Sequence, residues 1–140
     1  MPILISIQKR FSDLIFEGFK RIEIRKFFPA NFRGTMIVYE CGDGSCHKVV
    51  GKFHTHGVAI YDPEKGVTPE VREAMKAAEA TNQDWQNLTN LSERRYIIPV
   101  LDAVRITTRP LDEFSALYKT NPVLTPPRSW TLFRCEARRK

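Results

Sequence analysis

The first quarter of the chain shows three hydrophobic patterns in succession. Residues 3–7 (ILISI) form a β-branched apolar run, which predicts a strand. Between residues 9 and 18 apolar positions recur at helical spacing and end at Gly18, which predicts a short helix. Residues 19–28 then alternate with a period of two, which predicts a half-buried strand. This alternation places Lys20, Ile22 and Ile24 on one face and Arg21, Glu23 and Arg25 on the other.

The remainder of the chain continues this mixture of short strands and helices. Strands are expected at 35–40, at 49–60 with a bend at Gly57, at 96–107 and at 130–135. Helices are expected at 68–82, where Thr68 caps the first turn and Pro69 opens it, at 84–95 and at 111–118. This order predicts an α+β, mainly β fold: a small mixed β-barrel with a few peripheral helices.

The composition is that of one globular domain spanning residues 1–140, with 42% apolar and 27% charged residues. Three cysteines, an odd number, argue against a disulfide scaffold. The first apolar run has its charges after it rather than before it, unlike a signal peptide, and no apolar stretch reaches the length of a membrane span. We therefore expect a cytoplasmic protein without a membrane partner. No cofactor is expected, and the sequence does not indicate an oligomeric state.

Positive charge is in excess and clustered. Lys and Arg total 22 against 16 Asp and Glu, a formal net charge of +6. The excess gathers at 20–33 and at 128–140. Clustered cations attract phosphates by counterion release, which favours a nucleotide or RNA partner. The alternative is a basic surface that only keeps the protein soluble or meets an acidic protein.

A spaced motif crosses the end of the first helix and the next strand. Gly18, Lys20, Glu23 and Arg25 form the pattern Gly-x-Lys-x-x-Glu-x-Arg, after a strand that ends in Ser-Ile. In this the segment 3–25 resembles the ASCH family of the PUA-like superfamily. The likeness extends through 36–51, 96–111 and 126–130 and so covers most of the chain. It implies a PUA-like β-barrel, a fold used for RNA binding, with the motif lining a cleft.

The motif residues themselves suggest a binding role. Glu23 between two arginines is expected to stay ionised and to anchor a guanidinium. Arg25, held in this way, is expected to present its fork to a phosphate or a base edge. The alternative is a cross-strand salt bridge without a ligand. The expected nucleic-acid-binding set is Lys20, Arg21, Arg25, Tyr39, Arg128 and Ser129, with Tyr39 bordering the cleft from the following strand.

A hydrolase is the second hypothesis. One branch of the ASCH family consists of amidohydrolases that remove an acetyl group from modified cytidine, in which the motif lysine acts with a threonine three residues later. Lys20 matches that lysine, whereas Glu23 stands in the place of the threonine. Other members resemble ribonucleases. The resemblance therefore leaves open an enzyme acting on RNA or on an acylated nucleoside, with Lys20 and Glu23 as its catalytic residues.

One further cluster has metal-ligating side chains. Cys41, Cys46, His47, His54 and His56 lie within sixteen residues. Their spacing is not that of a usual zinc knuckle, and a zinc site needs four ligands that converge on one point. We therefore expect a hairpin with incidental cysteines and exposed histidines, and no metal site.

Overall fold

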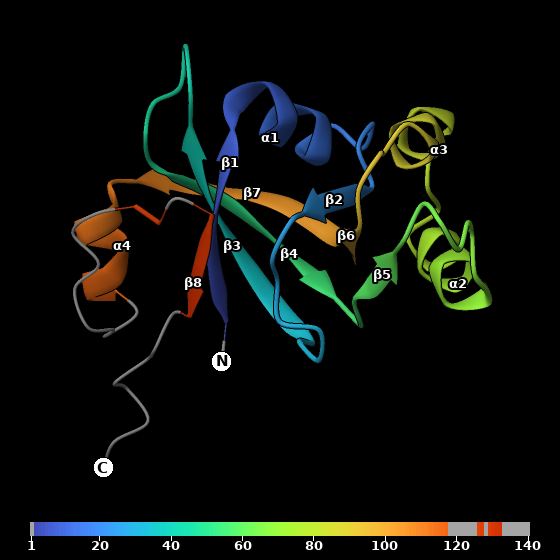
Figure 1. The fold of residues 1–140 in the computed structure, drawn as a ribbon. Coiled ribbons are helices and arrows are strands. Elements are labelled where there is room, and N and C mark those ends of the chain that lie inside the picture. The colour runs from blue at the N-terminus through green and yellow to red at the C-terminus, as the bar shows by residue number, and fades with distance from the viewer. Residues whose placement is uncertain (1, 118–125, 128, 133–140) are drawn as a thin grey trace.

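The computed structural model describes residues 2–117, 126–127 and 129–132, and over these it forms two β-sheets and four helices (Figure 1). The larger sheet has the strand order β7-β4-β3-β1-β8, and the smaller has the order β2-β6-β5. Their strands are β1 (Ile3–Gln8), β2 (Ile22–Arg25), β3 (Gly34–Cys41), β4 (Val49–Thr55), β5 (Ala59–Tyr61), β6 (Arg95–Pro99), β7 (Leu101–Arg109) and β8 (Trp130–Leu132). Among the described strands, only β1 and β3 pair in parallel. The α+β prediction is therefore confirmed.

The helices lie at the edges of the sheets. They are α1 (Lys9–Phe16), α2 (Pro69–Ala77), α3 (Asn82–Thr89) and α4 (Leu111–Leu117). Helices α2 and α3 lie together at one side of the molecule, and α4 lies at the opposite side (Figure 1). Helix α1 connects the larger sheet to the smaller one. Within the described residues, no helix has both the length and the apolar character needed to cross a membrane.

Two strands that the sequence predicts as continuous are each divided between the sheets. The predicted strand 49–60 becomes β4 and β5, and the break at residues 56–58 lies at Gly57, where the sequence predicted a bend. The predicted strand 96–107 becomes β6 and β7, separated at Val100, whose backbone N–H donates to Arg21 O at 2.9 Å. Each break turns the chain from one sheet into the other. These two corners hold the sheets together and set the position of β2 beside the larger sheet.

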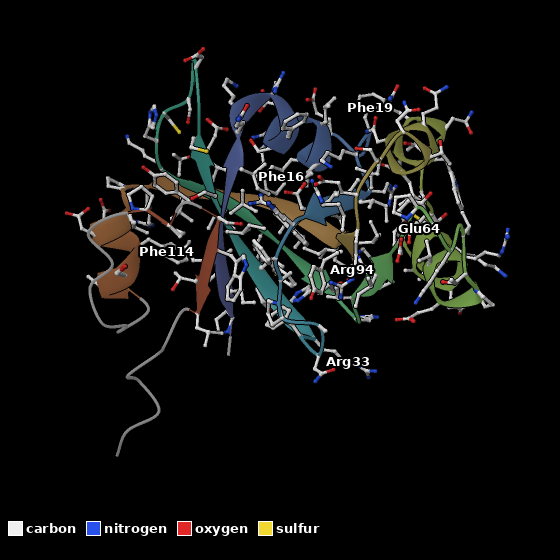
Figure 2. All side chains as sticks on the ribbon, in the orientation of Figure 1. Phe16, Phe19, Arg33, Glu64, Arg94 and Phe114 are labelled. Atoms are coloured by element: carbon white, nitrogen blue, oxygen red, sulfur yellow. The ribbon has the colours of Figure 1, made fainter. Side chains whose placement is uncertain are left out.

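In the part of the chain that the structure describes, the core has three parts. Strand β1 is buried on both faces, which explains its unbroken apolar run. On one face Ile3, Ile5 and Ile7 pack with residues of β3, β4 and β6. On the other face Leu4 packs in a cluster that includes Phe114 of α4, which Figure 2 labels. The third cluster joins the small sheet to α2 and α3.

Helix α3 begins earlier than the sequence predicted, at Asn82 rather than Asp84, because a capping box precedes it. Thr81 Oγ1 accepts from Asp84 N at 3.1 Å, and Thr81 N donates back to Asp84 Oδ2 at 2.9 Å. The same buried carboxylate accepts from Arg21 N at 3.1 Å. Asp84 therefore attaches α3 to the chain immediately before β2. The helix ends at Thr89, well before the predicted residue 95.

Candidate functional site

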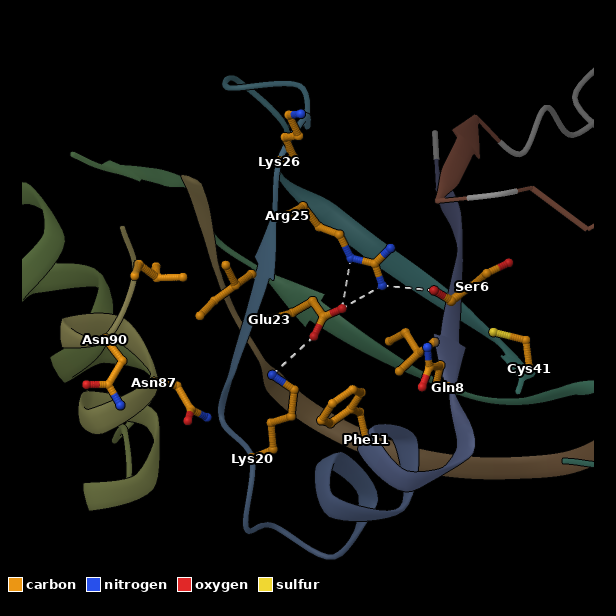
Figure 3. Close-up of a pocket in the computed structure, with 13 residues that line it drawn as sticks. Ser6, Gln8, Phe11, Lys20, Glu23, Arg25, Lys26, Cys41, Asn87 and Asn90 are labelled. Atoms are coloured by element: carbon orange, nitrogen blue, oxygen red, sulfur yellow. Dashed lines mark hydrogen bonds and ion pairs between the residues drawn. The ribbon is translucent and has the colours of Figure 1, made fainter. Parts of the chain in front are cut away.

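A cavity of about 660 Å³ opens between the end of β1, the start of α1, strand β2 and helix α3 (Figure 3). We call it the Glu23 pocket. Its polar lining residues are Ser6, Gln8, Lys20, Glu23, Arg25, Lys26, Cys41, Asn87 and Asn90. Phe11, Ile7, Ile24 and Leu91 complete the lining. The strand–helix–strand segment that carries the sequence motif therefore forms one wall of the pocket, and α3 forms another.

A buried carboxylate at the wall of the pocket holds two cations. Glu23 is only 5% exposed. Its Oε1 lies 3.2 Å from Lys20 Nζ, and its Oε2 accepts from Arg25 Nη2 at 2.6 Å and from Arg25 Nε at 2.9 Å. Figure 3 shows Glu23 between the two cations. The three groups together carry one positive charge toward the cavity.

The ionisation of Glu23 results from two opposing effects. Burial is the largest single influence and raises its pKa, because a carboxylate loses its hydration there. The positive charges of Lys20 and Arg25 and their hydrogen bonds act in the opposite direction, and together they hold the Glu23 pKa below its ordinary value. Glu23 therefore remains an anion at neutral pH, which confirms the predicted direction. The cations that cause it are Lys20 and Arg25, not the expected pair of arginines.

Lys20 contributes through its position just before β2. Because the strand begins at Ile22, the alternation of faces does not extend back to Lys20, and its side chain lies with those of Glu23 and Arg25. The ammonium donates to Ile22 O as well as to Glu23. It also lies 5.9 Å from the centroid of the Phe11 ring. Only 12% of the Lys20 side chain is exposed, so the group is partly screened from bulk solvent.

Arg25 acts mainly as a brace between elements. Besides Glu23, it donates through Nη2 to Ser6 O at 2.8 Å and through Nη1 to Ser129 Oγ at 3.0 Å. Ser129 O in turn accepts from Ser6 N at 2.8 Å. Most of the guanidinium hydrogens are therefore used within the protein, so the expected free fork facing a phosphate is not what the structure contains. Ser129 contacts the site through Arg25 and does not line the cavity.

Of the residues that line the pocket, only Lys20, Glu23 and Arg25 were predicted site residues; Phe11, Asn87 and Asn90 are among those that were not. Phe11, an apolar residue of α1, is 37% exposed. Asn87 projects from α3 and Asn90 caps the end of that helix, and both are exposed. Asn87 Oδ1 accepts from Gln83 Nε2 at 2.9 Å, which leaves the Asn87 amide hydrogens for other partners. The sequence held no signal for this wall, because the contacts that bring α3 to β2, such as Leu88 packed with Ile22 and the Asp84 carboxylate bonded to Arg21 N, join residues that are distant in the chain.

The remaining predicted residues lie elsewhere. Arg21 lines a separate hollow with Gly18 and Asp102, on the far side of Lys20. Tyr39 does not border the Glu23 pocket: it is buried on the face of β3 that packs under α4, and burial raises its pKa. The expectation that β3 would supply a stacking ring here was wrong, because its side chains alternate and this one faces the other part of the core. Arg128 lies outside the described residues.

The cysteine and histidine cluster does not converge. Thr35 Oγ1 and His54 Nδ1 lie 3.0 Å apart, whereas His47 Nδ1 lies 3.1 Å from Ser45 O in the hairpin loop. His56 lies beyond β4, at the corner that leads to β5. Among the residues that the structure describes, no group of three or more His, Cys, Asp or Glu side chains is arranged to hold a metal ion.

The arrangement of the Glu23 pocket is suited to binding an anion next to a flat ring. Lys20 and Lys26 supply positive charge at the cavity, and Phe11 supplies an exposed aromatic face beside Lys20. The amides of Asn87 and Asn90 offer hydrogen-bond donors and acceptors on the facing wall. The volume lies within the usual range of pockets for small ligands.

The fold is that of ASCH domains. The crystal structure of ASCH from Zymomonas mobilis aligns with a TM-score of 0.62 at 20% identity, over 95% of this chain and 87% of that one. A ZmASCH variant with a tyrosine replaced by phenylalanine gives 0.63 at 18% identity, over 95% and 90%. A variant with a serine replaced by alanine gives 0.62 at 18% identity, over 95% and 88%. No family model and no curated protein matches the chain. The expected ASCH-type fold is confirmed, and similarity at this level of identity concerns the fold alone.

Proposed function

We propose that this chain binds single-stranded RNA, or a nucleotide, in the Glu23 pocket. The observation that carries the proposal is the buried Glu23 carboxylate, which holds Lys20 and Arg25 at the wall of a cavity of about 660 Å³ beside the exposed ring of Phe11. An arrangement of this kind places positive charge and a flat apolar surface side by side, as a phosphate and a base require.

The phosphate contact is assigned to Lys20 and Lys26. Arg25 has most of its donors engaged with Glu23, Ser6 and Ser129. It therefore supplies positive potential and holds the pocket wall in place, but it does not offer a free pair of N–H donors to a phosphate. Lys26 is exposed, and it forms no ion pair with any of the described residues. An ammonium with unused hydrogens binds a phosphate as a point charge.

The base contact is assigned to Phe11 and to α3. A base stacked on the Phe11 ring would also lie near the Lys20 ammonium, which is 5.9 Å from the ring centroid. Asn87 and Asn90 on the facing helix would then meet a base edge. Stacking on an aromatic side chain tolerates every base, whereas the amides add preference.

The arrangement supports binding more than covalent chemistry. The Lys20 ammonium donates to Ile22 O and to the Glu23 carboxylate, which suits an electrostatic role. A hydrolase acting on RNA or on an acylated nucleoside remains the second hypothesis, with the same Lys20 at its centre. Incubation of the protein with single-stranded RNA and with acetylated cytidine, analysed for product, separates the two hypotheses.

The proposal is tested by fluorescence anisotropy with a labelled single-stranded RNA at low salt. We expect Lys20→Met to weaken binding about tenfold or more, because one desolvated phosphate contact and part of the field are lost. Lys26→Met, which disturbs no ion pair, is expected to weaken it less. Lys76→Met is the matched control, since Lys76 is an exposed lysine on α2 that lines none of the cavities described above.

Thermal unfolding of each variant shows whether it is folded at the temperature of the assay. Equal affinity of the Lys20→Met, Lys26→Met and Lys76→Met variants would refute the assignment to this pocket. Absence of RNA and nucleotide binding by the unchanged protein at low salt would refute the function and favour an acidic protein partner.

A further inference from the structure

An exposed aromatic ring lies just beyond the Glu23 pocket. Phe27 follows β2 by two residues, and 70% of it is exposed. Its backbone is nevertheless fixed, because Phe27 O accepts from Trp130 Nε1 at 2.9 Å. The next residue, Phe28, is buried and packs edge-on against Trp130 with ring centroids 5.6 Å apart. The exposure of the Phe27 ring is therefore built into a rigid part of the fold.

Lys26 connects this ring to the pocket. The Lys26 side chain lines the pocket, and its Nζ lies 5.6 Å from the centroid of the Phe27 ring. This distance is within the range of a cation–π contact. A ligand phosphate at Lys26 would therefore lie next to the exposed face or edge of Phe27.

The opposite end of the pocket has the same combination of ring and cation. Phe11 has the Lys20 Nζ 5.9 Å from its ring centroid, and Arg10 Cζ 4.5 Å from it. Figure 3 shows Phe11 and Lys20 at one end of the site and Lys26 at the other, with Glu23 and Arg25 between them. Two exposed aromatic rings, each beside a basic side chain, thus flank one charged wall.

This pattern fits a chain of nucleotides better than a single one. Proteins that bind single strands alternate cations, which follow the phosphates, with aromatic rings, on which successive bases stack. We propose that Phe27 is a second stacking platform, outside the pocket, for the nucleotide that follows the one bound in the pocket. The inference rests on the proposed function and defines its ligand as a single-stranded RNA longer than one nucleotide.

The test compares a mononucleotide with homopolymeric RNAs of two, three and four nucleotides, measured by isothermal titration calorimetry against the whole chain. For the unchanged protein we expect a gain in affinity between one and three nucleotides. Phe27→Leu is expected to reduce this gain about tenfold, since a leucine cannot stack on a base. The affinity for the mononucleotide is expected to stay unchanged. Phe11→Leu is expected to weaken binding of both ligands.

Phe19→Leu is the matched control, because Phe19 is 65% exposed and lines none of the cavities described above. Mononucleotide binding with no effect of Phe27→Leu on the trinucleotide would overturn the second platform and leave the proposed function standing. An equal loss for both ligands would also overturn it, because Phe27 would then belong to the pocket. If the unchanged protein bound neither ligand, the proposed function itself would fail, and this inference with it.

Discussion

At the scale of single residues, Glu23 is the most constrained group of the site. A buried ion pair contributes little net stability compared with an apolar core, yet removal of one partner is costly because a charge is left without compensation. Glu23 has two cationic partners, and each of its oxygens contacts a different one. The residue therefore sets where Lys20 and Arg25 point. Its main contribution is to orient the charged side chains at the pocket wall.

The stability of the fold is expected to depend on pH through Glu23. The Glu23 pKa is lower in the folded protein than its ordinary value of 4.5, so its charge stabilises the fold above about pH 4.5, and this stabilisation is lost as the pH falls through the lowered pKa. Glu23→Gln mimics the protonated acid. We expect the free energy of unfolding of the variant at pH 7 to be about 3 kcal/mol lower than that of the unchanged protein. Urea denaturation at several pH values measures both proteins.

The difference between the two proteins is expected to shrink as the pH is lowered below 4.5, because the unfolded chain of the unchanged protein then binds a proton at Glu23 that the folded state, with its lowered pKa, does not yet bind. A difference that stays constant from pH 7 to pH 3 would contradict the assignment of a lowered pKa to Glu23. Glu64→Gln is a suitable control, since that carboxylate is exposed in the loop before α2.

The motif residues show what the sequence can and cannot reveal at this scale. The alternation grouped Glu23 with Arg25 but placed Lys20 on the opposite face, whereas the likeness to ASCH domains put the motif at one cleft, and the structure brings all three residues together. The sequence could not reveal that Arg25 donates hydrogen bonds to Ser6 and Ser129, because both residues are distant from it in the chain. Nor could the spacing reveal that Phe11 is 37% exposed, because apolar residues at helical spacing show the same pattern whether or not a neighbouring element covers them.

At the scale of elements, the approach of α1 to the larger sheet depends on a residue without a side chain. Gly51 lies in β4, beneath Phe16 of α1 and beside β7. A Cβ at this position would lie 2.3 Å from Phe16 Cζ and 2.7 Å from Val104 O. The second atom belongs to the backbone of a paired strand and cannot move freely. Figure 2 labels Phe16 under α1, which carries Phe11 into the site.

We therefore expect Gly51→Ala to lower the free energy of unfolding by about 1–3 kcal/mol, because α1 and β7 must move apart to admit a methyl group. The loss should extend to RNA binding, since α1 positions Phe11. Gly57→Ala is the control, because a Cβ there meets no atom within 4 Å. Equal urea midpoints for the two variants would show that the packing of α1 is not as tight as these distances require.

The division of the two long strands shows the limit of prediction for elements. Residues 49–60 and 96–107 were each predicted as a single strand, the first with a bend at Gly57. Each one in fact changes sheets, at Gly57 and at Val100. A corner of this kind depends on which sheet each half of the segment can join. Pairing between strands that are distant in the sequence cannot be read from the local hydrophobic pattern. The type and order of the elements were predictable, whereas their division between two sheets was not.

At the scale of the whole molecule, the positive charge is placed unevenly with respect to the site. The chain carries +6 in total, and the pocket residues Lys20, Arg25 and Lys26 against Glu23 account for a local excess of two charges. The first basic cluster of the sequence, at 20–33, thus lies partly at the pocket. Most of the second, at 128–140, is outside the described residues. The electrostatic contribution of the pocket can therefore be isolated by its salt dependence.

For single-stranded RNA the logarithm of affinity falls with the logarithm of salt concentration with a slope of about −0.7 per phosphate neutralised. With two net charges at the pocket we expect a slope of about −1.4 for an oligonucleotide of four residues, measured by anisotropy from 50 to 200 mM salt. Lys26→Met is expected to make the slope shallower by about 0.7, and Lys76→Met to leave it unchanged. A slope near zero for the unchanged protein would remove the electrostatic basis of the proposed function. If the slope were the same for Lys26→Met and for Lys76→Met, the cations that contact the RNA would lie outside the Glu23 pocket.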